Sequence, residues 1–291
     1  MHDLIQRLLA AGPVLTDGAW GTELQARGLA IGEFPDAWNL THPESVEAVA
    51  RAYVEAGSRV ILTNTFGANR VRLAAHGLAD RTVELNRRGV EISRRAAGDG
   101  VSVFASIGPS GTLLLPDETE VDELAAAFAE QARALEEAGA DALVIETMSD
   151  PAEAVLAVTA ARATGLPVVA CLVFDSGRDR DRTMMGTTPE AAAAALMEAG
   201  ADVIGANCGQ GIEGFVTICR RLRAATDRPL WIKANAGLPR MVDGRAVYDV
   251  SPEQFAGHVP ALLDAGANFV GGCCGTGPAF IAQLHRRSLG G

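Results

Sequence analysis

Glu55-Ala-Gly-Ser-Arg-Val-Ile-Leu-Thr-Asn-Thr65 begins a pattern that the chain repeats three more times. The other copies are Glu137-Ala-Gly-Ala-Asp-Ala-Leu-Val-Ile-Glu-Thr147, Glu198-Ala-Gly-Ala-Asp-Val-Ile-Gly-Ala-Asn-Cys208 and Asp264-Ala-Gly-Ala-Asn-Phe-Val-Gly-Gly-Cys-Cys274. Each copy reads as a helix end, a glycine just after the helix, a short turn and a buried strand. The glycines at 57, 139, 200 and 266 lie 82, 61 and 66 residues apart, and one β/α unit takes roughly 30 residues. Each interval therefore holds about two units, which predicts eight strands.

Short apolar segments between the copies supply the strands that the repeat leaves out. The eight expected strands are residues 14–17, 60–64, 101–106, 142–146, 168–173, 203–207, 230–235 and 269–272. Alanine-rich segments with helical spacing lie between them, for example residues 121–138 and 189–199. This alternation is typical of a parallel sheet. Eight units in 291 residues predict an α/β fold, a single eight-stranded parallel β/α (TIM) barrel that occupies residues 1–291 as one domain.

The composition excludes several classes of protein. Lys and Arg total 25 against 36 Asp and Glu, a formal net charge of −11, so we expect neither a nucleic-acid nor an anionic-membrane partner. The first residues do not resemble a signal peptide, and the longest apolar runs are too short to cross a membrane. We therefore expect a cytoplasmic protein, with homo-oligomer formation left open.

The expected connections are long on one side of the barrel only. Links from helix to strand take three or four residues, whereas four links from strand to helix, residues 18–41, 107–120, 174–188 and 236–251, are much longer. In a β/α barrel such loops lie at the carboxyl ends of the strands, where active sites are built. The sequence therefore predicts a functional site on that face.

Polar side chains end nearly all of the expected strands. They are Asp17, Asn64, Thr65, Ser106, Glu146, Thr147, Asn207, Cys208, Lys233, Asn235, Cys273 and Cys274. A polar group at the end of a buried strand needs a partner, so one such group can simply cap a strand or a helix. The recurrence across the sheet instead indicates one shared polar site.

Three of the five cysteines stand out within this set. Cys208 ends the sixth expected strand and Cys273-Cys274 ends the eighth, so the three thiols should converge. Three thiolates at an active-site face suit a Zn²⁺ ion with one open coordination position. The alternatives are buried free cysteines, which we expect for Cys171 and Cys219, and a strained Cys273–Cys274 disulfide.

Such a zinc site favours sulfur chemistry over activation of water. Three thiolates give the site excess negative charge and a preference for a further soft ligand. A substrate thiol with a pKa near 8.5 is only a few per cent ionised at neutral pH, and coordination to zinc deprotonates it. The expected product is a sulfur nucleophile that can attack carbon.

Five motifs resemble the homocysteine S-methyltransferase family. They are Asp17-Gly-Ala-Trp-Gly-Thr22, Asn64-Thr-Phe-Gly67, Ile145-Glu-Thr147, Asn207-Cys-Gly209 and Gly271-Gly-Cys-Cys-Gly-Thr276. The resemblance runs from about residue 12 to residue 285. It includes bacterial betaine–homocysteine methyltransferases, S-methylmethionine–homocysteine methyltransferases and the homocysteine-binding module of cobalamin-dependent methionine synthase.

The resemblance implies a function and a role for each motif. The family transfers a methyl group to the thiol of homocysteine and gives methionine, with zinc on three cysteines that match Cys208, Cys273 and Cys274. Acids matching Asp17 and Glu146 hold the amino-acid head group, with backbone N–H groups at Gly18 and Ala19. Asn235 of Lys233-Ala-Asn-Ala-Gly237 matches the residue whose oxygen fills the zinc site in the methionine-synthase branch when substrate is absent.

The methyl donor remains open at this stage. The resemblance favours a betaine-like donor, and aromatic faces recognise a quaternary nitrogen. The candidates on strand-end links are Trp20, Phe34, Trp38, Phe66 and Phe174, whereas Gly67 and Met148 depart from the aromatic residues of the animal betaine enzymes. S-methylmethionine and a corrinoid carried by another protein are the other donors.

Two other functions fit parts of the sequence. One is a non-catalytic homocysteine- and zinc-binding module that serves a separate corrinoid methyl-carrier protein. The other is a Schiff-base lyase that uses Lys233 inside the seventh strand. The lyase hypothesis assigns no role to the three cysteines or to Glu146.

Overall fold

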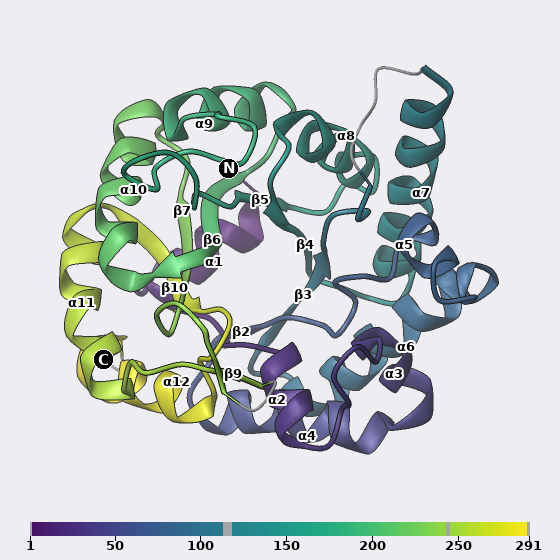
Figure 1. The fold of residues 1–291 in the computed structure, drawn as a ribbon, viewed down its shortest axis with the longest axis horizontal. Coiled ribbons are helices and arrows are strands. Elements are labelled where there is room, and N and C mark those ends of the chain that lie inside the picture. The colour runs from purple at the N-terminus through teal and green to yellow at the C-terminus, as the bar shows by residue number, and fades with distance from the viewer. Residues whose placement is uncertain (1, 113–117, 243–244, 290–291) are drawn as a thin grey trace.

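Eight parallel strands surround a central axis, and helices surround the strands (Figure 1). The structure is a computed structural model that describes residues 2–112, 118–242 and 245–289. The barrel strands are β1 (Val14–Leu15), β2 (Val60–Ile61), β3 (Ser102–Ile107), β4 (Ala142–Met148), β5 (Val168–Leu172), β6 (Val203–Gly211), β7 (Leu230–Asn235) and β10 (Ala267–Gly272). The predicted TIM-like barrel is confirmed.

Most helices lie around the outside of the barrel, whereas the first helix, which precedes β1, contributes Ile5 and Leu8 to the cluster inside the barrel. In chain order, the helices are α1 (Asp3–Leu9), α2 (Gly21–Ala26), α3 (Trp38–Thr41), α4 (Pro43–Glu55), α5 (Arg70–Ala74), α6 (Thr82–Ala97), α7 (Glu118–Glu137), α8 (Pro151–Arg162), α9 (Pro189–Glu198), α10 (Ile212–Ala225), α11 (Pro252–Asp264) and α12 (Pro278–Leu284). Short 3₁₀ turns lie at Pro35–Ala37 and Ala79–Arg81, and a π-helical turn lies at His285–Leu289. None of the described helices is long and apolar enough to span a membrane.

The sheet runs in the order β1-β10-β7-β6-β5-β4-β3-β2, and its two edges meet. A parallel bridge joins Thr16 to Val60, and the Arg59 N–H donates to the Leu15 carbonyl at 2.8 Å. β1 and β2 are shorter than the expected strands because only this narrow contact joins them. The barrel is therefore nearly closed between β1 and β2, and β1 pairs on its other side with β10, the last strand of the barrel.

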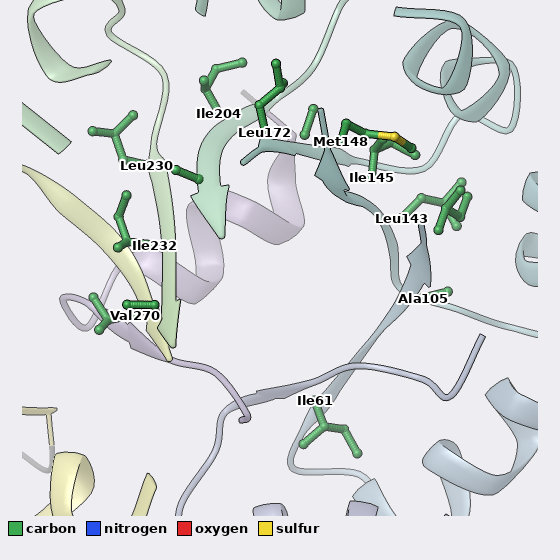
Figure 2. Close-up of a cluster of buried hydrophobic side chains, with 14 of the residues drawn as sticks. Ile61, Ala105, Leu143, Ile145, Met148, Leu172, Ile204, Leu230, Ile232 and Val270 are labelled. Carbon is green, nitrogen blue, oxygen red and sulfur yellow. The ribbon is translucent and has the colours of Figure 1, made fainter. Parts of the chain in front are cut away.

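Alternate residues along the strands face two different cores. Val60, Phe104, Val144, Cys171 and Trp231 belong to a buried cluster that fills the barrel interior. Their sequence neighbours face outward and pack against the helices, as Figure 2 shows for Ile61, Ala105, Leu143, Ile145, Met148, Leu172, Ile204, Leu230, Ile232 and Val270. This alternation follows from the period of two in an extended strand. The same period makes every second residue near a strand end point into the barrel mouth.

The four glycines of the repeat all adopt the left-handed conformation. Their φ angles are +101° at Gly57, +90° at Gly139, +98° at Gly200 and +100° at Gly266. Glycine tolerates this conformation because it has no Cβ, and it ends each helix before the chain turns into the next strand. The predicted helix–glycine–strand unit is confirmed at all four places.

The long strand-to-helix links contain structure that the sequence did not suggest. The first link carries α2 and α3, and the last carries a two-stranded antiparallel hairpin of β8 (Arg240–Val242) and β9 (Arg245–Val247). In Figure 1 this hairpin lies near the barrel mouth. Residues 113–117 of the second expected link and residues 243–244 of the last lie outside the described residues.

Candidate metal centre at the barrel mouth

Three cysteine sulfurs meet at the carboxyl ends of β6 and β10. The Sγ atoms of Cys208, Cys273 and Cys274 all lie within 4.8 Å of one another, and those of Cys208 and Cys274 are 3.9 Å apart. A tetrahedral ion with metal–sulfur bonds of about 2.3 Å holds its sulfurs roughly 3.8 Å apart. The three thiols are partly exposed and none forms a disulfide. The sulfurs therefore fit a metal ion with room for a further ligand.

Irregular backbone in β6 presents two consecutive residues to the site. The register of β6 against β7 shifts between Asn207 and Gly211, and Cys208 has a φ of +61°. A residue with a side chain rarely adopts this conformation, and such strain gathers at functional sites. A matching irregularity lies in β4, which β5 separates from β6 in the sheet, and there Thr147 has a φ of +62°. Regular strands would instead send Cys208 and Thr147 away from the barrel interior.

The three thiols share their protons unequally. Hydrogen bonds from the thiols of Cys273 and Cys274 lower the pKa of Cys208 to about 3. The same interaction with Cys208 raises the pKa of Cys274 to about 12 and also raises the pKa of Cys273. One sulfur is thus a thiolate that two neighbouring thiols stabilise. On metal binding the thiols of Cys273 and Cys274 would lose their protons, and the ion would then stabilise the negative charge on the sulfurs.

Asn235 supplies an independent observation in favour of a metal. Its side chain lies at the end of β7 and hydrogen bonds with Cys208. Its Oδ1 atom is buried and has no hydrogen-bond partner among the described residues. A buried carbonyl oxygen without a partner is unfavourable, whereas a metal ion beside the three sulfurs would give it one. Asn235 therefore fits the expectation that its oxygen can complete the coordination sphere.

Asp17 and Lys233 form a buried ion pair beside the cysteines. Lys233 Nζ lies 2.5 Å from Asp17 Oδ1, and the two side chains are 2% and 0% exposed. Burial alone would lower the pKa of Lys233, but the charges of Asp17 and Glu146 outweigh it and raise the pKa. The amine is therefore protonated and lacks the free electron pair that a Schiff-base nucleophile requires. This observation argues against the lyase hypothesis.

Glu146 occupies the opposite side of the same barrel layer. Its Oε1 accepts a hydrogen bond from Ser106 Oγ at 2.5 Å, and its Oε2 lies 3.4 Å from Asn207 Nδ2. Burial raises the pKa of Glu146, and the positive charge of Lys233 opposes that effect. Asn207 also accepts from the Thr147 N–H and donates to the Thr147 hydroxyl, at 2.8 and 2.7 Å. Asn207 therefore connects the end of β4, which carries Glu146, to Cys208, the residue that follows Asn207 in the chain.

The Asp17-Gly-Ala segment passes close to the cysteine loop. A Cβ atom on Gly18 would overlap the Thr276 carbonyl and approach the Tyr53 hydroxyl at 2.9 Å. The Ala19 N–H donates to the Thr276 carbonyl at 2.8 Å, and the Ala19 carbonyl accepts from Tyr53 at 2.5 Å. Glycine is needed at position 18 because no side chain fits there. Roles for the backbone of Gly18 and Ala19 in substrate binding stay predictions.

Two of the polar strand-end residues stabilise a loop instead of joining the site. Asn64 donates to the Pro35 carbonyl at 2.8 Å and to Asn39 Oδ1 at 3.0 Å. The hydroxyl of Thr65 donates to the Ser106 carbonyl at 2.7 Å. Both side chains are buried; Asn64 fixes the link between β1 and α4 against the end of β2, and Thr65 joins the end of β2 to β3. For these two residues the simpler interpretation, that polar groups cap strands, fits the contacts.

Three of the five aromatic candidates for donor binding are core residues. Phe34, Trp38 and Phe174 are buried, and Phe34 stacks on His76 with 4.3 Å between ring centroids. Trp20 and Phe66 are half-buried. The indole N–H of Trp20 donates to Asp17 Oδ2 at 2.8 Å. Trp20 and Phe66 are therefore the two of the five candidates that are not buried.

Tyr248 is a site residue that the sequence analysis missed. It follows β9, and its ring packs so closely on Gly275 that a Cβ atom there would overlap it. Its hydroxyl hydrogen bonds with Cys274, and burial together with the negative charge of Cys274 raises the pKa of the phenol. The available signal was weak, because Tyr248 lies in a long link with no regular pattern.

Comparison with known proteins gives a consistent assignment. The family model described as homocysteine S-methyltransferase matches residues 14–288. Methionine synthase of Mycobacterium tuberculosis is 32% identical over 296 residues, which cover 95% of this chain and 25% of that protein. The crystal structure of the metallated form of the homocysteine methyltransferase MmuM from Escherichia coli superposes with a TM-score of 0.81 at 28% identity, and covers 98% of this chain and 99% of that one. Methionine synthase of Mycobacterium leprae is 31% identical over 301 residues, which cover 97% of this chain and 25% of that protein. The chain thus spans about a quarter of the length of the methionine synthases that it matches.

Proposed function

The chain belongs to the homocysteine S-methyltransferase family, and we propose that it transfers a methyl group from a donor to the thiol of homocysteine, giving methionine. The observation that carries this proposal is the convergence of Cys208, Cys273 and Cys274 within 4.8 Å at the mouth of the barrel. The similarity to a metallated homocysteine methyltransferase over nearly the whole chain supports it.

Zinc is the metal that best fits these donors. Three thiolates and one amide oxygen form a soft, closed set of four when Asn235 contributes its Oδ1 atom. Asn235 is the neutral member of that set, and homocysteine sulfur would displace it. When bound, the ion supplies the positive charge that lowers the pKa of the substrate thiol. The protein residues then have to hold the amino-acid end of the substrate.

Carboxylates and backbone groups flank the cysteines, where they can bind the amino-acid end of homocysteine. Glu146 and Asp17 provide negative charge for the ammonium group, and the backbone at Gly18 provides an N–H for the carboxylate. Both acids come from strand ends on the same face of the barrel as the cysteines. The substrate thus lies with its sulfur at the cysteines and its head group toward β1 and β4.

The transfer itself is a direct displacement at the methyl carbon. The substrate sulfur forms a bond to the methyl group while the bond from that carbon to the donor breaks, and its electron pair leaves with the donor. No covalent bond to the protein is required. The methionine product is a thioether without a negative charge, so it binds a thiolate-rich metal site less well than the thiolate did.

The donor within this proposal is betaine-like. Trp20 and Phe66 support this choice, because these aromatic residues lie on the links after β1 and β2 and are only half-buried. A second candidate is a homocysteine- and zinc-binding module that acts with a separate corrinoid carrier. The similarity to two methionine synthases supports that alternative.

A donor assay tests the proposal. The zinc-loaded protein is mixed with homocysteine and with betaine, S-methylmethionine or methylcobalamin in parallel, and methionine is measured. Turnover with betaine is the expected result, and turnover with another donor would establish the reaction but contradict the donor. No turnover by a protein that holds zinc and homocysteine would support the binding-module alternative.

Substitution of the cysteines tests the metal. Replacing Cys208, Cys273 or Cys274 with Ala should abolish zinc binding and methyl transfer together, as measured by metal analysis and methionine formation. Cys219→Ala is the matched control, because Cys219 is buried in α10 and its thiol hydrogen bonds with the backbone carbonyls of Leu262 and Ala265, away from the three converging cysteines. Full activity in a zinc-free cysteine variant would rule out the proposed site.

A further inference from the structure

Asn207 joins the ends of two strands that do not pair with each other. β4 and β6 lie on either side of β5 in the sheet. The Oδ1 atom of Asn207, in β6, accepts a hydrogen bond from the Thr147 N–H at 2.8 Å, and its Nδ2 atom donates to the Thr147 hydroxyl at 2.7 Å. Asn207 is completely buried. Both polar atoms of this amide thus bind one residue of β4, which fixes the position and the rotation of the side chain.

The two hydrogen bonds lie beside two residues in the left-handed conformation. Thr147 has a φ of +62°, and Cys208, which follows Asn207, has a φ of +61°. Residues with a side chain adopt this conformation at a cost, and they keep it only where the surrounding contacts hold them. Successive residues of a regular strand point to opposite faces. The left-handed turn is therefore what lets Cys208 point to the same side as Asn207.

Pairing within the sheet does not hold Cys208 in place. The register pairs of β6 end at Ala206 on the β5 side, and on the β7 side they pass from Asn207 directly to Gly211. Among the described residues, Cys208 thus has no register partner in either neighbouring strand. The Gln210 side chain holds the far end of this segment, because it donates to two carbonyls of the link after β5. The anchor on the near side is Asn207.

We propose that Asn207 is a positioning residue for the metal centre, and that its amide, by binding Thr147, holds the end of β6 so that the Cys208 sulfur meets those of Cys273 and Cys274. The inference rests on the metal site of the proposed function and adds the contact across β5 on which that site depends. Asn207 acts through Cys208 and supplies no ligand atom. Ligands that are held in place before binding give a tighter metal site.

Zinc affinities of single and double variants test this role, measured by competition with a chromogenic chelator. Asn207→Ala should weaken zinc binding about tenfold or more, because Cys208 can then relax into an extended conformation that turns its sulfur away. Thr147→Val removes the hydroxyl that accepts from Asn207 and should also weaken binding. Thr147→Ser keeps that hydroxyl and should stay within about twofold of wild type. In the double variant Asn207→Ala/Thr147→Val the two losses should not add, since the first change already removes the contact.

Cobalt substitution gives a readout that a general loss of stability would not change. Co²⁺ bound by thiolates has a charge-transfer absorption band that grows with the number of bound sulfurs. At equal saturation with cobalt, Asn207→Ala should show a weaker band than wild type.

The matched control is Asn86→Ala. Asn86 is also buried, and its Nδ2 atom donates to the carbonyls of Ala68 and Thr82 at 2.8 Å each. It therefore joins separate segments as Asn207 does, but it contacts none of the three cysteines. Asn86→Ala should lower the temperature of thermal unfolding and leave both the zinc affinity and the cobalt band unchanged.

Several outcomes would overturn the inference. One is a folded Asn207→Ala variant with the zinc affinity and cobalt band of wild type. Another is a double variant in which the two losses add, because Asn207 and Thr147 would then act independently. If Asn207→Ala does not fold, equal zinc affinities for Thr147→Val and Thr147→Ser would overturn it. A zinc-loaded wild type that transfers no methyl group would contradict the proposed function and leave this inference standing.

Discussion

Asp36 is a carboxylic acid enclosed by the link between β1 and α4. It is 3% exposed, and its Oδ1 accepts a hydrogen bond from the Gly67 N–H at 2.9 Å. Burial raises its pKa to about 7, although the Gly67 hydrogen bond and the charge of Arg72 oppose the shift. The folded protein therefore holds a proton on Asp36 that the unfolded chain releases near pH 4.

This difference predicts how stability depends on pH. The stabilising contribution of protonated Asp36 is complete below about pH 4 and disappears as the pH rises through about 7. Asp36→Asn should remove this pH-dependent contribution to the free energy of unfolding, which is at most about 4 kcal/mol. The measurement is urea unfolding of both proteins from pH 4.5 to 8. Parallel curves for the two proteins would contradict the assignment.

At the scale of single residues, the sequence predicted identities but not partners. Cys208, Cys273 and Cys274 could be grouped because a thiol at the end of a parallel strand has a predictable position. Lys233 was noticed for its place inside a strand, yet its partner Asp17 lies 216 residues away. That pairing depends on β1 and β7 both flanking β10, which local sequence patterns do not encode.

At the scale of elements, the β8–β9 hairpin connects a surface link to the metal centre. Tyr248 directly follows β9, its ring packs on Gly275, and its hydroxyl hydrogen bonds with Cys274. Groups that hydrogen bond to metal ligands adjust their charge and orientation. The hairpin was expected only as a loop, because its strands are three residues each and too short for a periodic pattern.

Tyr248→Phe should weaken zinc binding. The ring and its packing on Gly275 remain, but the hydroxyl that donates to the Cys274 sulfur is lost. The expected decrease in zinc affinity is about tenfold or more, measured by competition with a chromogenic chelator. Met241→Ala is the control, since this side chain lies on the same hairpin and is exposed. An unchanged affinity in Tyr248→Phe would show that the hydroxyl does not affect the metal.

At the scale of the whole molecule, an apolar layer in the barrel interior packs against the polar residues of the site. Trp231 fills that interior between Phe104 and Phe269, with ring centroids 6.0 and 5.3 Å away. Lys233 lies two residues further along β7, with Nζ 5.9 Å from the centroid of the Trp231 ring. The indole N–H has no hydrogen-bond partner among the described residues. The polar layer of the site therefore lies directly on an apolar layer.

Two substitutions of Trp231 should have very different effects. Trp231→Ala should lower the free energy of unfolding by about 3–5 kcal/mol because it leaves a large cavity in the barrel. Trp231→Phe should lose less than half as much, because it also removes a buried N–H that lacks a partner. Urea unfolding measures both values. Equal losses would mean that the indole N–H is satisfied in solution.

The amino-acid sequence by itself determined the barrel and the cysteine centre. The repeat with its four glycines predicted eight β/α units, and parallel β/α connections place all strand ends on one face. For that reason the polar residues at those ends could be assigned to a common site. The fold and the convergence of the three cysteines thus followed from local patterns and one topological rule.

Only the tertiary structure decided how that site is organised inside. It paired Lys233 with Asp17, placed Phe34 and Trp38 in the core, and brought Tyr248 over Gly275. Each of these features depends on barrel closure, on strand irregularities or on packing between distant segments. Charge balance and burial are properties of a three-dimensional neighbourhood, so no pattern along the chain encodes them.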